Sequence, residues 1–120
     1  MDKSFYKDLI LFHWKNPKNY GSLKKPSKKV FLNNPFCGDA IKMEAIIKND
    51  KIKDIKFSGK GCIISLATAS LLTEYAKNKD ISRLKKLDKN FILDLIKIDL
   101  GPTRLKCALL PLEALKKIIQ

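Results

Sequence analysis

The sequence predicts an α+β domain in which helices pack on one face of a three-stranded antiparallel sheet. The chain begins with apolar residues at helical spacing, within residues 3–15. A stretch of period-two alternation with a turn inside it, residues 30–57, then indicates three strands in succession. Helix-forming segments fill the rest of the chain, which suits an architecture with helices on one side of a sheet.

The first element is predicted to be a helix over residues 3–15. Apolar side chains recur there at helical spacing: Phe5, Leu9 and Phe12, with Ile10 beside them. The helix should end at Asn16, because the residue before a proline is disfavoured in helical geometry. Residues 17–29 contain two prolines, one glycine and five lysines, so we predict a polar loop there.

Three short strands are predicted next. Residues 30–32 form the first strand, and residues 41–47, which alternate in polarity, form the second. Asn49 and Asp50 supply a turn into a partner strand over residues 52–57. Because each strand follows directly on the one before, we expect an antiparallel meander.

The C-terminal half is predicted to be helical. Residues 63–77 combine small and apolar residues with helix formers. Two aspartates are candidate N-caps of shorter helices: Asp80 for a helix that ends at Lys86, and Asp88 for one that ends at Ile98. A last helix is expected from about Leu105 to Gln120, with Pro111 kinking or restarting it.

The charge of the chain indicates the kind of partner. The 120 residues carry a net charge of +13, and almost all of the basic residues are lysine. Such a charge attracts nucleic acids, anionic membranes or acidic proteins. Arginine is the residue suited to bidentate phosphate and guanine contacts, and Arg83 and Arg104 are the only arginines. An acidic protein partner therefore explains the charge at least as well as nucleic acid does, and nucleic-acid binding is not favoured.

Size and cysteine content limit the class further. A chain of 120 residues suits one domain, here residues 1–120. Its N-terminus shows no signal-peptide pattern, and no apolar stretch approaches the roughly 20 residues that span a bilayer. Three cysteines, an odd number, do not make a closed disulfide framework. We therefore expect a soluble, cytoplasmic protein that makes no use of a membrane.

The three cysteines share a setting that favours a metal site. Each lies beside glycine or just after a Gly-Pro pair, at a predicted element boundary: Cys37 before Gly38-Asp39, Cys62 after Gly61, and Cys107 after Gly101-Pro102. Gly38 lets the backbone bend so that Cys37 and Asp39 can face one centre. A helix that starts at Cys62 would favour a thiolate there. No Cys-x-x-Cys pair is present, which excludes a zinc finger, and core filling is the alternative for any single cysteine.

Four segments of the chain resemble the IscU/SufU family, which also occurs as the N-terminal domain of NifU. They are Phe12 to Gly21, Asn34 to Asp39, Gly59 to Ser70 and Arg104 to Leu110. Together they span nearly the whole chain in the family's order, with the three cysteine motifs at the family's separations. The resemblance implies a SufE/IscU-like fold, a three-stranded antiparallel sheet covered by helices, which agrees with the pattern above.

The resemblance also implies a scaffold for iron–sulfur cluster assembly. Such a protein receives persulfide sulfur from a cysteine desulfurase and builds it with iron into a transient [2Fe–2S] cluster, or passes it on. The implied ligands of zinc or of the cluster are Cys37, Asp39, Cys62 and Cys107, and Cys107 or Cys37 would accept the sulfur. A carboxylate is a harder ligand than a thiolate, so Asp39 should help a cluster to leave. Apo iron–sulfur proteins or tRNA-thiolation enzymes are the implied acceptors, and a monomer or a cluster-bridged dimer the implied state.

Two sequence features that distinguish the IscU-type and SufU-type subfamilies point to different subfamilies. Lys106 precedes the last cysteine, as in SufU-type members, where IscU-type members carry histidine. The chain lacks the SufU-type insertion before that cysteine, and Leu100 to Arg104 replaces the chaperone-binding Leu-Pro-Pro-Val-Lys segment of IscU. A zinc-dependent sulfurtransferase of the SufU type, which relays sulfur without building a cluster, is therefore the alternative. Whether the protein is an enzyme stays open, and a basic metal-containing domain that binds nucleic acid is a weaker third interpretation.

Several other residues have both a functional and a structural interpretation. Lys106 and Arg104 are candidates to support the site, by favouring the Cys107 thiolate or by pairing with a carboxylate, with a plain surface role as the alternative. His13 is expected to be a packing or surface residue, because it lies away from the cysteine motifs. Three small polar residues without a histidine base are expected to allow close helix packing: Ser65, Thr68 and Ser70.

Overall fold

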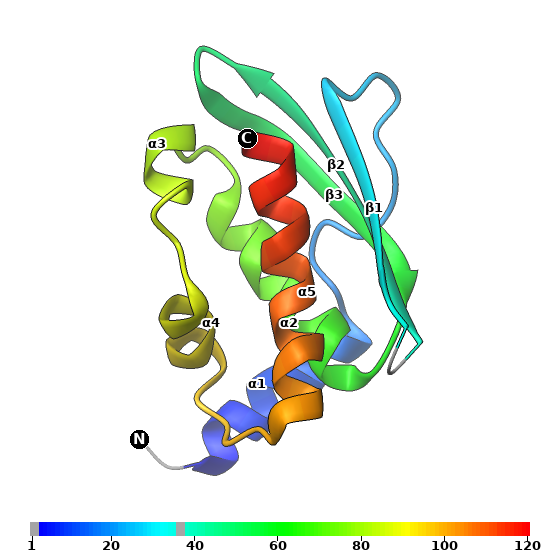
Figure 1. Ribbon diagram of the computed structural model, residues 1–120, viewed down its shortest axis with the longest axis vertical. Coiled ribbons are helices and arrows are strands. Elements are labelled where there is room, and N and C mark those ends of the chain that lie inside the picture. Colours follow the sequence, from blue (N-terminus) through cyan, green and yellow to red (C-terminus); the bar gives the residue numbers. More distant parts are fainter. Residues whose placement is uncertain (1–2, 36–37) are drawn as a thin grey trace.

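The computed structural model describes residues 3–35 and 38–120, and it confirms the predicted fold class (Figure 1). A three-stranded antiparallel sheet, in the order β1-β2-β3, lies on one side of the helices. The elements in chain order are α1 (Lys3–Lys15), β1 (Lys28–Asn34), β2 (Asp39–Lys48), β3 (Lys51–Lys60), α2 (Ile63–Ala76), α3 (Ile81–Leu84), α4 (Lys89–Ile96) and α5 (Pro102–Ile119). Within the described ranges, no helix combines the length and apolarity needed to cross a membrane.

The sheet presents an apolar face to the helices. Alternate residues of β2 and β3 point to that face and are fully buried: Ile41, Met43, Ala45, Ile55 and Phe57. The turn between the two strands is made by Asn49 and Asp50, both at positive φ, as a tight hairpin with right-handed twist requires. The predicted turn and the predicted inward face are therefore confirmed.

β3 is longer than its side-chain pattern predicts, because backbone pairing continues beyond the last apolar residue. Ser58, Gly59 and Lys60 stay in register with the beginning of β2. Gly59 has a φ of +150°, and an added β-carbon would overlap the carbonyl oxygen of Ala40. The close approach of the two strands at this point thus requires glycine. It also brings the end of β3 next to the start of β2.

Two long helices form the layer that covers the sheet. α5 packs on β1 and β2, α2 packs on β3, and the two helices also contact each other (Figure 1). α3 and α4 lie on the far side of this layer from the sheet, and α1 packs across α2. Since α2 has neighbours on most sides, ten of its residues are buried, including polar Ser65, Thr68 and Ser70. The packing role predicted for these small residues is confirmed.

The last helix begins earlier than predicted and continues past its internal proline. α5 begins at Pro102, with Gly101 as its N-cap, and not near Leu105. Proline is favoured in the first turn, where its missing N–H needs no partner. Pro111 does not restart the helix, which continues to Ile119. Pro111 is buried, so packing of its ring offsets the lost backbone hydrogen bond.

The two predicted N-caps have different outcomes. Asp88 caps α4, where its Oδ1 accepts a hydrogen bond from the Phe91 amide at 3.2 Å. Asp80 precedes α3 but makes no side-chain cap, and its Oδ1 lies 3.9 Å from Lys51 Nζ instead. Asp80 is therefore the N-cap residue of α3, as predicted, but it caps the helix without a side-chain hydrogen bond. Both helices also end two residues earlier than predicted, which is the usual uncertainty at frayed ends.

α1 occupies its predicted range but turns a different face to the core. Ile10 and His13 are buried at 3% and 4% exposure, whereas Phe5 and Phe12 are 49% and 50% exposed. Phe5 and Phe12, whose spacing predicted the helix, therefore do not face the core. The reason is tertiary: His13 Nδ1 shares a 2.7 Å hydrogen bond with Ser70 Oγ on α2, so a polar residue takes the central position of the interface.

The loop after α1 is attached to both the helices and the sheet. The Lys18 amide donates to Ser70 Oγ at 2.7 Å, which anchors the start of the loop on α2. Gly21 N and Phe57 O are 2.8 Å apart, and Phe57 N donates to Asn19 O at 2.9 Å. The loop therefore pairs with the free edge of β3 and covers backbone groups that would otherwise be exposed.

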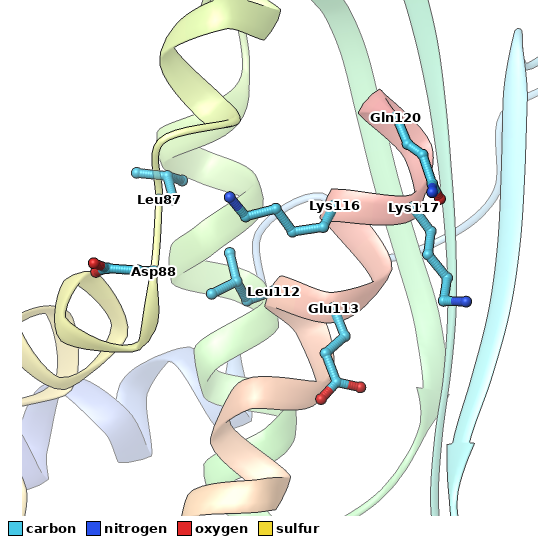
Figure 2. A pocket seen from close by; sticks show the side chains of 7 residues that line it. All are labelled: Leu87, Asp88, Leu112, Glu113, Lys116, Lys117 and Gln120. Carbon is cyan, nitrogen blue, oxygen red and sulfur yellow. The ribbon is translucent and has the colours of Figure 1, made fainter.

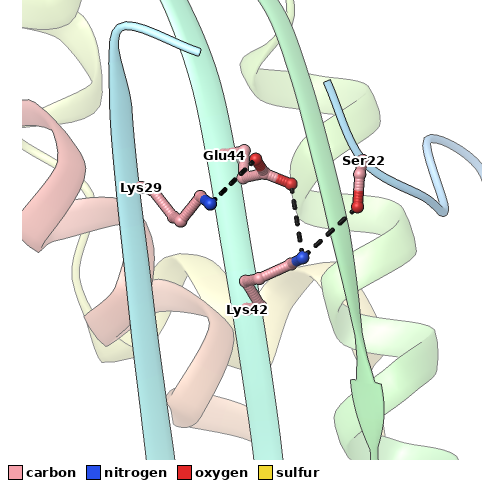
Figure 3. A network of polar contacts seen from close by, with 4 residues as sticks. All are labelled: Ser22, Lys29, Lys42 and Glu44. Atoms are coloured by element: carbon pink, nitrogen blue, oxygen red, sulfur yellow. Dashed lines mark hydrogen bonds and ion pairs between the residues drawn. The ribbon is translucent and has the colours of Figure 1, made fainter. Parts of the chain in front are cut away.

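A charged network lies on the sheet face opposite the helices (Figure 3). Glu44 is 2% exposed, and its carboxylate lies 3.7 Å from Lys42 Nζ and 4.0 Å from Lys29 Nζ. Lys42 also donates to Ser22 Oγ of the loop at 3.3 Å. A buried carboxylate is tolerated only when it is paired, so these lysines allow Glu44 to lie beneath the loop.

Burial of His13 predicts a pH-dependent stability. Desolvation lowers its pKa below the ordinary value of 6.5; Glu74 opposes this shift and Lys18 adds to it. The unfolded chain then binds a proton that the folded chain does not, so stability falls as the pH drops below 6.5 towards the folded-state pKa. We expect urea unfolding between about pH 7.5 and 5.5 to show a larger loss of unfolding free energy for the wild type than for His13→Asn. Equal losses in the two proteins would contradict this account.

Candidate metal centre

Three of the four predicted ligands lie together at one end of the fold. One ligand atom from each of Asp39, Cys62 and Cys107 can be chosen so that all three lie within 4.8 Å of one another. The residues are 23 and 45 positions apart and belong to three different segments, so only the tertiary fold brings them together. Cys37, the fourth predicted ligand, lies outside the described residues.

Asp39 is placed by the hairpin that joins β1 to β2. It is the first residue of β2 and pairs with Asn34, the last residue of β1. The Gly38 amide donates to Asn34 O at 2.8 Å, and Gly38 has a φ of +74°, a conformation that glycine adopts without strain. The predicted bend at Gly38 is confirmed, and it turns the Asp39 side chain inward, where it is 3% exposed.

Cys62 is the N-cap of α2, which confirms its predicted place at a helix start. Its Sγ accepts a hydrogen bond from the Ser65 amide at 3.4 Å. Its own backbone N–H donates to Asp39 Oδ1 at 3.1 Å, and its Sγ lies 3.7 Å from Asp39 Oδ2. One carboxylate oxygen is thus held by the backbone, while the other faces the sulfur.

Cys107 comes from α5 and is buried, at 3% exposure. It lies in the second turn of the helix and not at its start, because α5 begins at Pro102. Arg104 and Lys106 are exposed on the same part of α5. Lys106 lines a pocket of about 270 Å³ between α5 and the end of β1. The other lining residues are Asn33, Asn34, Pro35, Leu110 and Glu113. The supporting roles of Arg104 and Lys106 stay predictions.

These atoms lie close enough to meet at one tetrahedral ion after small side-chain movements. With zinc–sulfur bonds of about 2.3 Å and zinc–oxygen bonds of about 2.0–2.2 Å, tetrahedral angles place two ligand atoms roughly 3.5–3.8 Å apart. The Cys62 Sγ–Asp39 Oδ2 distance of 3.7 Å already has this spacing, and the limit of 4.8 Å for the whole group is closed by movements of about 1 Å. Two thiols and a carboxylate suit zinc, and thiolates also suit the iron of an iron–sulfur cluster.

Two other features are separate from this centre. His13 is not part of the ligand group, and its bond to Ser70 makes it a packing residue, as predicted. A pocket of about 500 Å³ lies at the far end of α5, beside the segment that precedes α4 (Figure 2). Its lining carries both charges and no cysteine or histidine: Leu87, Asp88, Leu112, Glu113, Lys116, Lys117 and Gln120.

Comparisons with known proteins agree with this geometry. The family model of the NifU-like N-terminal domain matches residues 5–120. The zinc-dependent sulfurtransferase SufU of Bacillus subtilis is 39% identical, over 95% of this chain and 88% of the relative. The iron–sulfur cluster assembly scaffold protein IscU of Rickettsia prowazekii is 35% identical, over 95% of this chain and 88% of the relative.

Solved structures have the same fold. A putative iron–sulfur cluster assembly scaffold protein for the SUF system from Fervidobacterium islandicum superimposes with a TM-score of 0.85 at 25% identity, over the whole of both chains. A NifU-like N-terminal protein from Brucella abortus has a TM-score of 0.78 over 95% of this chain and 91% of its own, at 17% identity, which concerns the fold alone.

The geometry predicts that zinc stabilises the folded protein through Asp39. A metal that binds only the folded state raises the melting temperature by mass action. We expect zinc to raise the melting temperature of the wild type and to raise that of Asp39→Ala less, because one ligand is lost and affinity falls at least about tenfold. The matched control is Asp94→Ala, which removes an exposed carboxylate from α4 and should respond to zinc like the wild type. Equal responses of all three proteins would exclude Asp39 as a ligand.

Proposed function

Because this chain belongs to the NifU-like N-terminal domain family, we propose that it is a sulfur acceptor and scaffold for iron–sulfur cluster assembly. It would take sulfur from a cysteine desulfurase and build it with iron into a transient [2Fe–2S] cluster, or pass it on. The observation that carries the proposal is the meeting of Asp39, Cys62 and Cys107 within 4.8 Å. Cys37 is proposed as the fourth member of the group, on its place in the motif next to Gly38 and Asp39.

The proposed chemistry is a thiol–persulfide exchange. A thiolate of this chain attacks the terminal sulfur of the desulfurase persulfide, and a new sulfur–sulfur bond forms as the bond to the donor cysteine breaks. The donor cysteine leaves as a thiolate, so the terminal sulfur is transferred to this chain with no net oxidation or reduction. We propose Cys107 or Cys37 as the attacking residue. Because Cys107 is 3% exposed, its attack requires the docked partner to open this end of the fold.

Asp39 is the ligand best suited to leave. A carboxylate is a harder ligand than a thiolate and binds a thiophilic metal less tightly. When it leaves, its Oδ1 still accepts the Cys62 amide at 3.1 Å, so departure does not strand a buried carboxylate without a partner. The group can therefore exchange one ligand without large loss of stability, which a site that receives and releases its cargo needs.

A zinc-dependent sulfurtransferase is the second candidate, and two observations favour it. The described ligand atoms lie within 4.8 Å of one another, so movements of about 1 Å would bring them onto a single ion. Lys106 also directly precedes Cys107, and in this the chain resembles SufU-type members. Bound zinc would hold the thiols deprotonated and ordered until the partner arrives. The alternatives differ in what the site carries, while the sulfur-accepting residues are the same.

We also propose the partners, the location and the domain organisation of the protein. A net charge of +13 suits an acidic face on the desulfurase, and apo iron–sulfur proteins or tRNA-thiolation enzymes would receive the product. The cytoplasm is the proposed location, since its reducing conditions keep thiols free for exchange. Every helix and strand has residues that belong to one hydrophobic cluster or pack against it, including Leu84 of α3, which supports one domain over residues 1–120.

Metal and sulfide content separates the two candidates. The protein is purified without oxygen or chelators, and zinc, iron and acid-labile sulfide are measured for the wild type and Asp39→Ala. Iron with matching sulfide, retained better by Asp39→Ala, is the expected result for a scaffold. About one zinc per chain without sulfide supports the sulfurtransferase. Protein that contains neither metal nor sulfide would contradict both the scaffold and the sulfurtransferase.

Cys107→Ser tests the accepting residue. Incubation with a cysteine desulfurase and cysteine should add sulfur to the wild type, seen by intact-protein and peptide mass spectrometry. We expect Cys107→Ser to lose this uptake by at least about tenfold, because an alcohol is not a nucleophile for sulfur transfer at neutral pH. Circular dichroism and urea unfolding check that the variant stays folded. Uptake at the wild-type level would exclude Cys107 and leave Cys37 as the acceptor.

A further inference from the structure

The backbone conformation at position 61 does not require glycine. Gly38 and Gly59 have φ values of +74° and +150°, which other residues avoid, but the φ of Gly61 lies outside the positive region. An alanine at position 61 would therefore meet no strain in the chain itself. The need for glycine must come from the space around it.

That space is filled by the Asp39 side chain. A β-carbon added to Gly61 would lie 2.9 Å from both Cγ and Oδ1 of Asp39, and 3.3 Å from its Cβ. The first two distances are shorter than van der Waals contact allows. Asp39 is 3% exposed, so its carboxylate cannot move away into solvent without leaving the site. A side chain at position 61 and the observed position of the carboxylate exclude each other.

The observed position of the carboxylate gives its two oxygens separate tasks. Oδ1 accepts the Cys62 amide at 3.1 Å, and Oδ2 faces the Cys62 sulfur at 3.7 Å. The residue that donates to Oδ1 directly follows Gly61, so the missing side chain and the hydrogen bond act on the same oxygen. An Asp39 that lies against Gly61 can bind the backbone with one oxygen and a metal with the other.

We infer that Gly61 is the positioning residue for Asp39: its missing side chain creates the space from which Asp39 reaches the metal with Oδ2 alone. The inference rests on the proposed metal centre and adds to it a residue that touches no metal. It makes Asp39 a one-oxygen ligand, restrained by the Cys62 amide. Outer contacts of this kind orient metal ligands, and their loss typically reduces metal affinity about 10–100-fold.

A double-mutant cycle on zinc affinity tests the inference. The four proteins are the wild type, Gly61→Ala, Asp39→Ala and the double variant, and zinc dissociation constants come from competition with a chelator. We expect Gly61→Ala to weaken zinc binding about tenfold in the wild-type background. The same change should have no effect when Asp39 is already alanine, because the residue that it displaces is gone.

The control for replacing glycine itself is Gly101→Ala. Gly101 has a φ of −70°, and an added β-carbon there meets no atom within 4 Å. It precedes α5, the element that carries Cys107, yet it should leave zinc affinity at the wild-type level. A loss from Gly61→Ala that persists without Asp39 would mean a general distortion of the β3–α2 junction and would overturn the inference. Unchanged affinity in Gly61→Ala would overturn it as well.

A second measurement needs no metal and separates this inference from the proposed function. The amide resonance of Cys62 in a ¹H–¹⁵N spectrum of the metal-free protein reports its hydrogen bond to Asp39. We expect Gly61→Ala and Asp39→Ala to shift this resonance in the same direction, with neighbouring helix resonances of α2 little changed. A Cys62 resonance that Gly61→Ala leaves in place would overturn the inference, even if the protein binds zinc. A chain that binds no metal but shows the shift would overturn the proposed function, with the positioning of Asp39 by Gly61 still supported.

Discussion

The contact on which the metal centre depends is the hydrogen bond from the Cys62 amide to Asp39 Oδ1. It joins the first residue of the central strand to the N-cap of the central helix, which are 23 residues apart. A backbone donor that meets a buried carboxylate is a strong, charge-assisted bond, and it satisfies an amide that the helix cannot use itself. The same bond holds Asp39 against Gly61 and turns Oδ2 to the Cys62 sulfur. Removing either partner would affect strand, helix and ligand group together.

The rest of the fold holds this corner in place from two sides. On one side α5 packs on β1, β2 and α2 and brings Cys107 into the group from the apolar core. On the other, Ser70 of α2 bonds both His13 of α1 and the backbone of Lys18, so the first helix and the following loop are attached to the helix that Cys62 caps. Asp39 and Cys107 are buried whereas Cys62 is solvent-accessible. The centre is therefore buried on the side of Asp39 and Cys107 and accessible from the N-terminus of α2, as an exchange with a second protein requires.

Patterns within one segment predicted most of the elements. The strand alternation and the Asn49-Asp50 turn were sufficient for the β2–β3 hairpin, because a two-residue turn at positive φ is a local property. Predictions failed where a local preference met a tertiary contact. Phe12 fits an apolar stripe, yet His13 faces the core because Ser70 offers it a partner. Pro111 breaks isolated helices, yet it lies inside α5 because the core packs against it. Asp80 is the N-cap residue of α3, yet its side chain makes no cap bond, since its carboxylate faces Lys51 at the start of β3.

The amino-acid pattern was sufficient to predict the fold class, because the periodicity of helices and strands can be detected along the chain. The candidate ligands Cys37, Asp39, Cys62 and Cys107 and the expected function followed from the resemblance of the motifs, in their order, to a known family. The tertiary structure alone decided that Asp39, Cys62 and Cys107 meet within 4.8 Å, that Cys107 is buried, and that Gly61 must be glycine to make room for a carboxylate. These facts depend on which distant segments touch, and contacts between β2, α2 and α5 have no trace in the local pattern of any one of them.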